Sequence, residues 1–213
     1  MKLSPLFYKV APLSTESPGP HPTLILLHGR GTDENDLLGL VPSFDPRLLI
    51  VSVRAPHEFS YGGYTWFNLD EENNVKADDI LGSCEALMKC LDDIQQKYPV
   101  DRERIFLFGF SMGAMMSLTL SLSYPERFKA IVAHSGMLLQ NDKLMYQWKD
   151  LSRLSFLIEH GTDDPVVPVE LGRNAHRLLF EAKTDVQYKE YAIQHTISEE
   201  SLNDAADWLH QRI

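Results

Sequence analysis

Cysteine, positive charge and long apolar runs are all scarce in this chain of 213 residues. Cys84 and Cys90 are its two cysteines, and both fall in one predicted helix, so we expect neither a disulfide framework nor a zinc site. Lys and Arg number 20 against 30 Asp and Glu, and the formal net charge of −10 argues against nucleic acid as a partner. No apolar run reaches the roughly 18 residues of a membrane span, and no signal-peptide core follows the N-terminus. We therefore expect a soluble, cytoplasmic protein.

Short apolar runs alternate with helical patterns along the sequence. This alternation is typical of an α/β domain in which a mostly parallel sheet carries helices on both faces. No repeat, linker or shift in composition marks a boundary, so a single domain over residues 1–213 is predicted. Strands are predicted near residues 6–10, 23–28, 48–53, 105–108, 128–133, 155–160 and 185–193, and helices near 75–98, 114–124, 170–181 and after Ser198.

The stretch from Arg104 to Leu118 carries the strongest chemical signal. A run of large apolar residues passes through Gly109-Phe-Ser-Met-Gly113 into a series of good helix formers. Strand, G-x-S-x-G and helix in this order form a nucleophile elbow, which exposes the serine hydroxyl at the end of a sheet strand. The pattern also occurs by chance, and Ser111 could simply cap the helix. Its position between strand and helix favours a catalytic role for Ser111.

A nucleophilic serine needs a base and an acid that orients the base, and in this architecture they follow the serine in the order acid, histidine. Asp163 and Asp164 come directly after the predicted strand 155–160, and the residues alone do not choose between them. His195 follows the last predicted strand and precedes a helix. His134 also ends a strand, but it precedes the acid in the chain. We therefore predict His195 as the base.

The tetrahedral intermediate of acyl transfer needs two backbone N–H donors for its oxyanion. One comes from the residue after the nucleophile, here Met112. The other is expected from the loop after an earlier strand, where Gly29-Arg30-Gly31 makes the Arg30 N–H the predicted donor. On their own, the two glycines could merely form a turn.

Four motifs stand out in the chain: Leu27-His-Gly-Arg-Gly-Thr-Asp-Glu-Asn-Asp-Leu37, Gly109-Phe-Ser-Met-Gly113, His160-Gly-Thr-Asp-Asp-Pro-Val-Val-Pro168 and the segment His195-x-x-Ser-x-Glu. Together they resemble the phospholipase/carboxylesterase family of α/β hydrolases, which is similar to acyl-protein thioesterases and small bacterial carboxylesterases. The resemblance extends over nearly the whole chain beyond about residue 20. It selects Asp164, the aspartate directly before the proline. Family members often carry Gly before the histidine, where this chain has Gln194.

The length of the chain leaves no room for a large lid domain, and we expect neither a cofactor nor a metal.

The sequence thus predicts a serine hydrolase that cleaves carboxylic esters of short to medium acyl chain. The resemblance leaves an acyl-protein thioesterase or a lysophospholipase open, and a binding protein that has lost turnover is the alternative from another class. A lactone or dienelactone hydrolase is disfavoured because those enzymes carry Cys at the elbow. A homodimer stays possible. The candidates for the acyl pocket are Tyr64, Trp66, Phe67, Met137 and Leu138.

Overall fold

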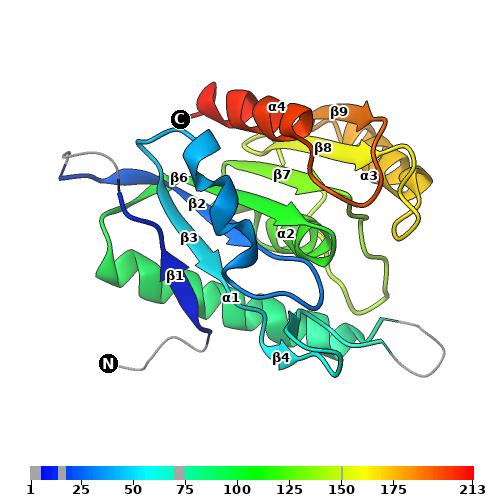
Figure 1. The fold of residues 1–213 in the computed structure, drawn as a ribbon, viewed down its shortest axis with the longest axis horizontal. Helices are drawn as coiled ribbons and strands as arrows, with labels where there is room; N and C mark the ends of the chain where they lie inside the picture. The colour runs from blue at the N-terminus through cyan, green and yellow to red at the C-terminus, as the bar shows by residue number, and fades with distance from the viewer. Residues whose placement is uncertain (1–5, 14–17, 70–74, 150) are drawn as a thin grey trace.

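A seven-stranded sheet runs through the centre of the molecule (Figure 1). The computed structural model describes residues 6–13, 18–69, 75–149 and 151–213. The strand order is β1-β3-β2-β6-β7-β8-β9, and every neighbouring pair is parallel except β1 with β3. The strands are β1 (Tyr8–Val10), β2 (His21–Leu27), β3 (Leu49–Val53), β6 (Val100–Phe110), β7 (Ala130–His134), β8 (Ser155–Gly161) and β9 (Asp185–Tyr191).

Helices cover both faces of this sheet (Figure 1). The side chains of α1 (Ala77–Lys97), α2 (Met112–Ser123) and α3 (Val169–Glu181) join the core on one face. The other face is covered by α4 (Glu199–His210) and a short 3-10 helix, η1 (Asp36–Ser43). A second 3-10 turn, η2, spans Pro125–Arg127. The predicted α/β domain with a mostly parallel sheet is confirmed; that this domain comprises all of residues 1–213 stays a prediction.

Strand alternation explains why the central strands are apolar throughout. In β6, Phe106 and Phe108 point into the core under α4, whereas Ile105 and Leu107 point into the core under α1 and α2. All four side chains are almost completely buried. A strand covered on both faces has no solvent side, and the run of apolar residues follows from that.

Residues 57–65 form a small hairpin of two strands, β4 (His57–Glu58) and β5 (Tyr64–Thr65). It is tied to the loop after β2, because the Gly31 N–H donates to Tyr64 O and the Tyr64 N–H donates to Thr32 O, each at 2.8 Å. The sequence pattern predicted neither this hairpin nor η1. Two-residue strands carry too little periodicity to be recognised, and contacts with a distant loop stabilise them.

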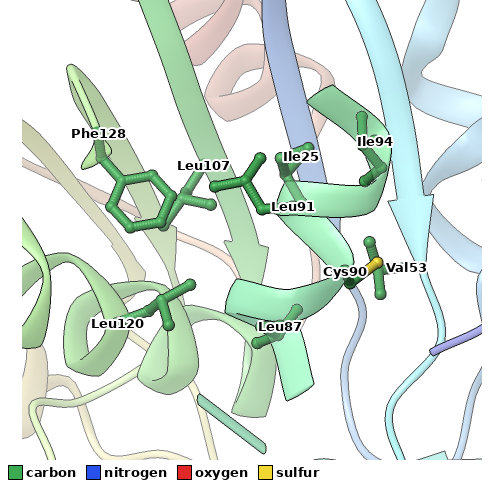
Figure 2. A pocket seen from close by; sticks show the side chains of 9 residues that line it. All are labelled: Ile25, Val53, Leu87, Cys90, Leu91, Ile94, Leu107, Leu120 and Phe128. Carbon is green, nitrogen blue, oxygen red and sulfur yellow. The ribbon is translucent and has the colours of Figure 1, made fainter. Parts of the chain in front are cut away.

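A small cavity of about 10 Å³ lies between α1, α2 and the sheet, and apolar side chains line it (Figure 2). It has room for at most about one water molecule. This cavity is therefore too small to hold an acyl chain. Among the described residues, no helix combines the length and the apolar character needed to cross a bilayer.

Candidate active site

Ser111, Asp164 and His195 meet at the carboxyl edge of the parallel strands. They follow β6, β8 and β9, and these strand ends lie at the same edge of the sheet. His195 Nε2 lies 2.8 Å from Ser111 Oγ, and His195 Nδ1 lies 2.7 Å from Asp164 Oδ2. An ionised Asp164 accepts the Nδ1 proton, which leaves Nε2 free to accept the proton of the Ser111 hydroxyl.

The turn that carries Ser111 is strained. Ser111 has φ 55° and ψ −118°, a conformation that a residue with a side chain rarely adopts. A Cβ at Gly113 would overlap Leu27 O, and one at Gly109 would overlap the backbone of Gly113. The two glycines thus let β6, α2 and the end of β2 approach one another closely enough to form the elbow.

Asp164 is held as a carboxylate by its hydrogen bonds. Burial alone would raise the pKa of its carboxyl group, but hydrogen bonds from His195 and from two backbone N–H groups outweigh burial and keep that pKa below its usual value. The backbone donors, Val166 and Val167, each lie 2.8 Å from Oδ1. The neighbouring Asp163 is exposed. The structure therefore pairs Asp164, and not Asp163, with His195. Gln194, the residue before His195, is exposed to solvent.

The predicted oxyanion donors belong to the start of α2 and to the loop after β2. Met112 is the first residue of α2, where helical N–H groups have no partner within the helix. The loop that carries Arg30 abuts the nucleophile, since a Cβ at Gly29 would lie 3.6 Å from Ser111 Cβ.

His28 and Trp66 fix this loop. The Ala55 N–H donates to His28 Nε2 at 3.0 Å, so Nδ1 carries the proton and donates to Gly29 O at 2.6 Å. Burial lowers the pKa of His28, which favours this neutral form. The indole N–H of Trp66 donates to His28 O at 2.9 Å.

A cleft of about 530 Å³ adjoins this loop. Arg30 lines it, and its guanidinium lies 5.3 Å from the centre of the Phe59 ring. Thr65, on the same wall, places its hydroxyl 3.1 Å from Met112 Sδ. Arg30 thus lines the cleft directly, and Met112 touches one of its lining residues through its side chain. The remaining lining residues of the cleft are Glu58, Ser60, Tyr61, Phe67, Asn68 and Leu69.

Of the five acyl-pocket candidates, Phe67 lies at this cleft, but its side chain is almost completely buried and belongs to the core. Trp66 and Leu138 are buried in the core, and Met137 packs against it. The Tyr64 ring packs against the Arg54 guanidinium at 4.6 Å. Apolar character alone could not separate these side chains, since core and cleft residues share it. Thr65 also lines the cleft but is not among the candidates. No sequence pattern marks it, because only the folded hairpin brings it to the cleft.

Among the residues that the structure describes, no group of three or more His, Cys, Asp or Glu side chains could hold a metal ion.

Comparison with known proteins shows the family of the chain. The sequence profile of the phospholipase/carboxylesterase family matches residues 13–213. A probable carboxylesterase SOBER1-like protein of Arabidopsis thaliana is 27% identical over 74% of this chain, and the match spans 63% of the plant protein. Acyl-protein thioesterase 1 of Gibberella zeae is 26% identical, over 96% of this chain and 97% of its own length.

The solved structure of esterase PE8 superposes with a TM-score of 0.83 at 30% identity, covering 98% of this chain and 99% of that one. Sequence and fold thus agree along the whole length of both proteins. The chain belongs to the phospholipase/carboxylesterase family, as a hydrolase of the carboxylesterase type.

Proposed function

We propose that this protein hydrolyses carboxylic esters of short to medium acyl chain through a Ser111-His195-Asp164 triad. The observation that carries the proposal is the pair of contacts made by His195, with Ser111 Oγ on one ring nitrogen and Asp164 Oδ2 on the other. A hydroxyl group becomes a useful nucleophile when an oriented base accepts its proton. A binding protein would not require this chain of contacts, which disfavours the silent alternative.

In the first half of the reaction, Ser111 Oγ attacks the acyl carbon while His195 Nε2 accepts its proton. Asp164 stabilises the imidazolium that results. The N–H groups of Arg30 and Met112 bind the oxyanion of the tetrahedral intermediate. His195 then returns the proton to the leaving alkoxide, and the acyl group remains as an ester on Ser111.

In the second half, water attacks the acyl-enzyme while His195 Nε2 accepts a proton from it. Collapse of the second tetrahedral intermediate breaks the bond to Ser111, which regains its proton from His195, and the carboxylic acid leaves. The mechanism uses no cofactor. In the cleft beside Arg30, Phe59 and Leu69 are the apolar side chains that could contact the acyl part of the substrate.

The first test is hydrolysis of p-nitrophenyl esters from acetate to palmitate, with Ser111→Ala in parallel. Loss of the nucleophile is expected to lower kcat by about 10⁴-fold or more. We expect the short and medium esters to be the best substrates. Equal turnover by both proteins would exclude Ser111 as the nucleophile, and labelling of the wild type by a fluorophosphonate probe would exclude a silent binding protein.

The two adjacent aspartates provide a matched pair. Asp164→Asn removes the charge that orients His195 and is expected to lower kcat by about 10³- to 10⁴-fold. Asp163→Asn changes the net charge equally but alters an exposed side chain, so its kcat should stay near that of the wild type. Similar losses of kcat in both variants would show that the lost negative charge, and not the lost hydrogen bond to His195, lowers the rate.

Thioester hydrolysis is the second candidate, favoured by the full-length similarity to the acyl-protein thioesterase of Gibberella zeae. The mechanism is the same for both substrate classes, so the triad does not discriminate between them. An oxygen ester and a thioester of the same acyl chain should be compared by kcat/KM. A tenfold or greater advantage of the thioester would assign the protein to that class.

The cytoplasmic location expected from the sequence stays a prediction. Nothing in the described part of the chain supports the homodimer that the sequence leaves open.

A further inference from the structure

His134 is a completely buried histidine that the triad does not use. It ends β7, the strand between those that lead to Ser111 and Asp164. Its Nε2 lies 2.9 Å from Ser201 Oγ, and its Nδ1 lies 3.0 Å from Ser135 Oγ. Burial lowers the pKa of His134 to about 3, so the ring is neutral at physiological pH. Both ring nitrogens of a neutral side chain are thus engaged with hydroxyl groups.

Ser201 belongs to the start of α4, directly after the loop that carries His195. The Ser201 N–H donates to Ser198 Oγ at 3.1 Å, and the Ser198 N–H donates to Ser201 Oγ at 3.0 Å. This reciprocal cap fixes the first turn of α4. Because Ser198 lies three residues after His195, the bond between His134 and Ser201 anchors the far end of the His195 loop to the sheet.

A second connection runs through an aromatic ring. The ring of Phe110, which directly precedes Ser111, lies 4.9 Å from the His195 ring and 5.8 Å from the His134 ring, measured between centroids. His134 O also accepts a hydrogen bond from the Ser111 N–H at 2.9 Å. His134 therefore contacts the backbone of the nucleophile, the ring packed on the base, and the helix cap that ends the loop of the base.

We propose that His134 is a positioning residue, which holds His195 within reach of Ser111 through Ser201 and Phe110. The proposal rests on the proposed function, because it assigns His195 as the base. The physical reason is that proton transfer depends steeply on distance and angle: a displacement of about 1 Å can cost about 100-fold in rate. The His195 loop is partly exposed and needs an anchor in the core.

The test compares His134→Leu, Ser201→Ala and the double variant, with His134→Gln as the conservative variant. We expect His134→Leu and Ser201→Ala each to lower kcat for p-nitrophenyl acetate by about tenfold, with KM within about twofold of the wild type. The double variant should lose no more than the worse single variant, because both remove the same contact. His134→Gln, which keeps a hydrogen-bonding group towards Ser201, should recover most of the lost kcat.

Ser121→Ala is the matched control. Ser121 is also a buried helix serine, but its hydroxyl donates to Leu118 O within α2. It should keep the kcat of the wild type. Thermal unfolding of every variant shows whether it is folded at the assay temperature, and kcat is expressed per active site titrated with a fluorophosphonate. If His134→Leu does not fold, Ser201→Ala and His134→Gln decide the question.

Folded variants with wild-type kcat, or losses that multiply in the double variant, would overturn the positioning role. A raised KM with unchanged kcat would do the same. These outcomes differ from failure of the proposed function, in which the wild type itself neither hydrolyses esters or thioesters nor reacts with the probe, and both proposals then fall.

Discussion

At the residue scale, Ser111 combines the greatest chemical importance with an unfavourable backbone. Its φ of 55° is one of three positive values found among the described residues other than glycine; the others belong to Ser135 and Lys183. Such a conformation costs about 1–3 kcal/mol, and the surrounding structure must supply the stabilisation. The strain exposes the hydroxyl at the sheet edge, where His195 can reach it.

Because of this strain, we expect two inactive variants at Ser111 to differ in stability. Ser111→Ala and Ser111→Gly should both abolish ester hydrolysis, because both lack the nucleophile. Glycine tolerates positive φ, so Ser111→Gly should have a free energy of unfolding about 1 kcal/mol higher than that of Ser111→Ala. Urea unfolding of the two inactive variants measures this difference. Equal stabilities would show that the backbone of the elbow is not strained.

At the element scale, the buried hydroxyl group of Tyr191 in β9 connects that strand to β8 and α4 beneath the site. Tyr191 Oη lies 2.8 Å from both Glu159 Oε1 and Asp204 Oδ2, although a hydroxyl has only one proton to donate. Asp204 pairs with Lys189 at 2.8 Å, which holds the pKa of Asp204 below its usual value. Glu159 is completely buried, and burial raises its pKa to about 8. The raised pKa favours the protonated form of Glu159, whose hydroxyl can donate to Tyr191 Oη and so leave the Tyr191 proton for Asp204.

This chain of hydrogen bonds predicts a specific dependence of stability on pH. Between about pH 5 and pH 8, folded Glu159 keeps a proton that the unfolded chain has lost, so the free energy of unfolding falls as pH rises. The slope from this group is at most about 1.4 kcal/mol per pH unit. Glu159→Gln keeps an N–H donor towards Tyr191 and should remove that slope.

Urea unfolding at pH 5, 6, 7 and 8 measures the difference between the two proteins. Exposed Glu103 provides the control, since Glu103→Gln makes the same change in formal charge on the surface and should run parallel to the wild type. Parallel curves for Glu159→Gln and the wild type would mean that Glu159 is ionised in the folded protein.

At the scale of the whole molecule, the formal net charge of −10 sets the field that a substrate meets. Long-range repulsion slows the approach of an anionic ligand and is screened by salt, with a Debye length of about 10 Å at 0.1 M. Locally, Arg30 is the one cation that lines the cleft within the described residues, and Glu58 lines it as well. The overall field should therefore dominate.

The prediction concerns two p-nitrophenyl esters of similar size, one neutral and one carrying a carboxylate. For the anionic ester, kcat/KM should rise several-fold as ionic strength increases from about 10 mM to about 500 mM. The neutral ester should change little and serves as the control. A preference for the anionic ester at low salt would show instead that the Arg30 guanidinium outweighs the overall charge.

Much of the fold and the triad could be predicted from the sequence because each depends on local pattern. Apolar strands such as 155–160 are read from composition, and Ser111 and His195 are marked by their positions after strands. The residues alone left Asp163 and Asp164 undecided, since both follow the same strand. The hairpin of β4 and β5 and the burial of Trp66 were not predictable, because both depend on partners far away in the chain.

What the sequence by itself determined is the order of strands and helices, the elbow at Ser111 and the chain order of its partners. These properties follow from short-range periodicity and from steric limits on the backbone. Only the tertiary structure decided that Asp164 faces His195, that the cleft lies beside Arg30, and that His134 joins β7 to α4. The Asp164–His195 and His134–Ser201 hydrogen bonds join residues that are 31 and 67 positions apart in the chain. Side chains this distant meet only when the sheet brings its strand ends together.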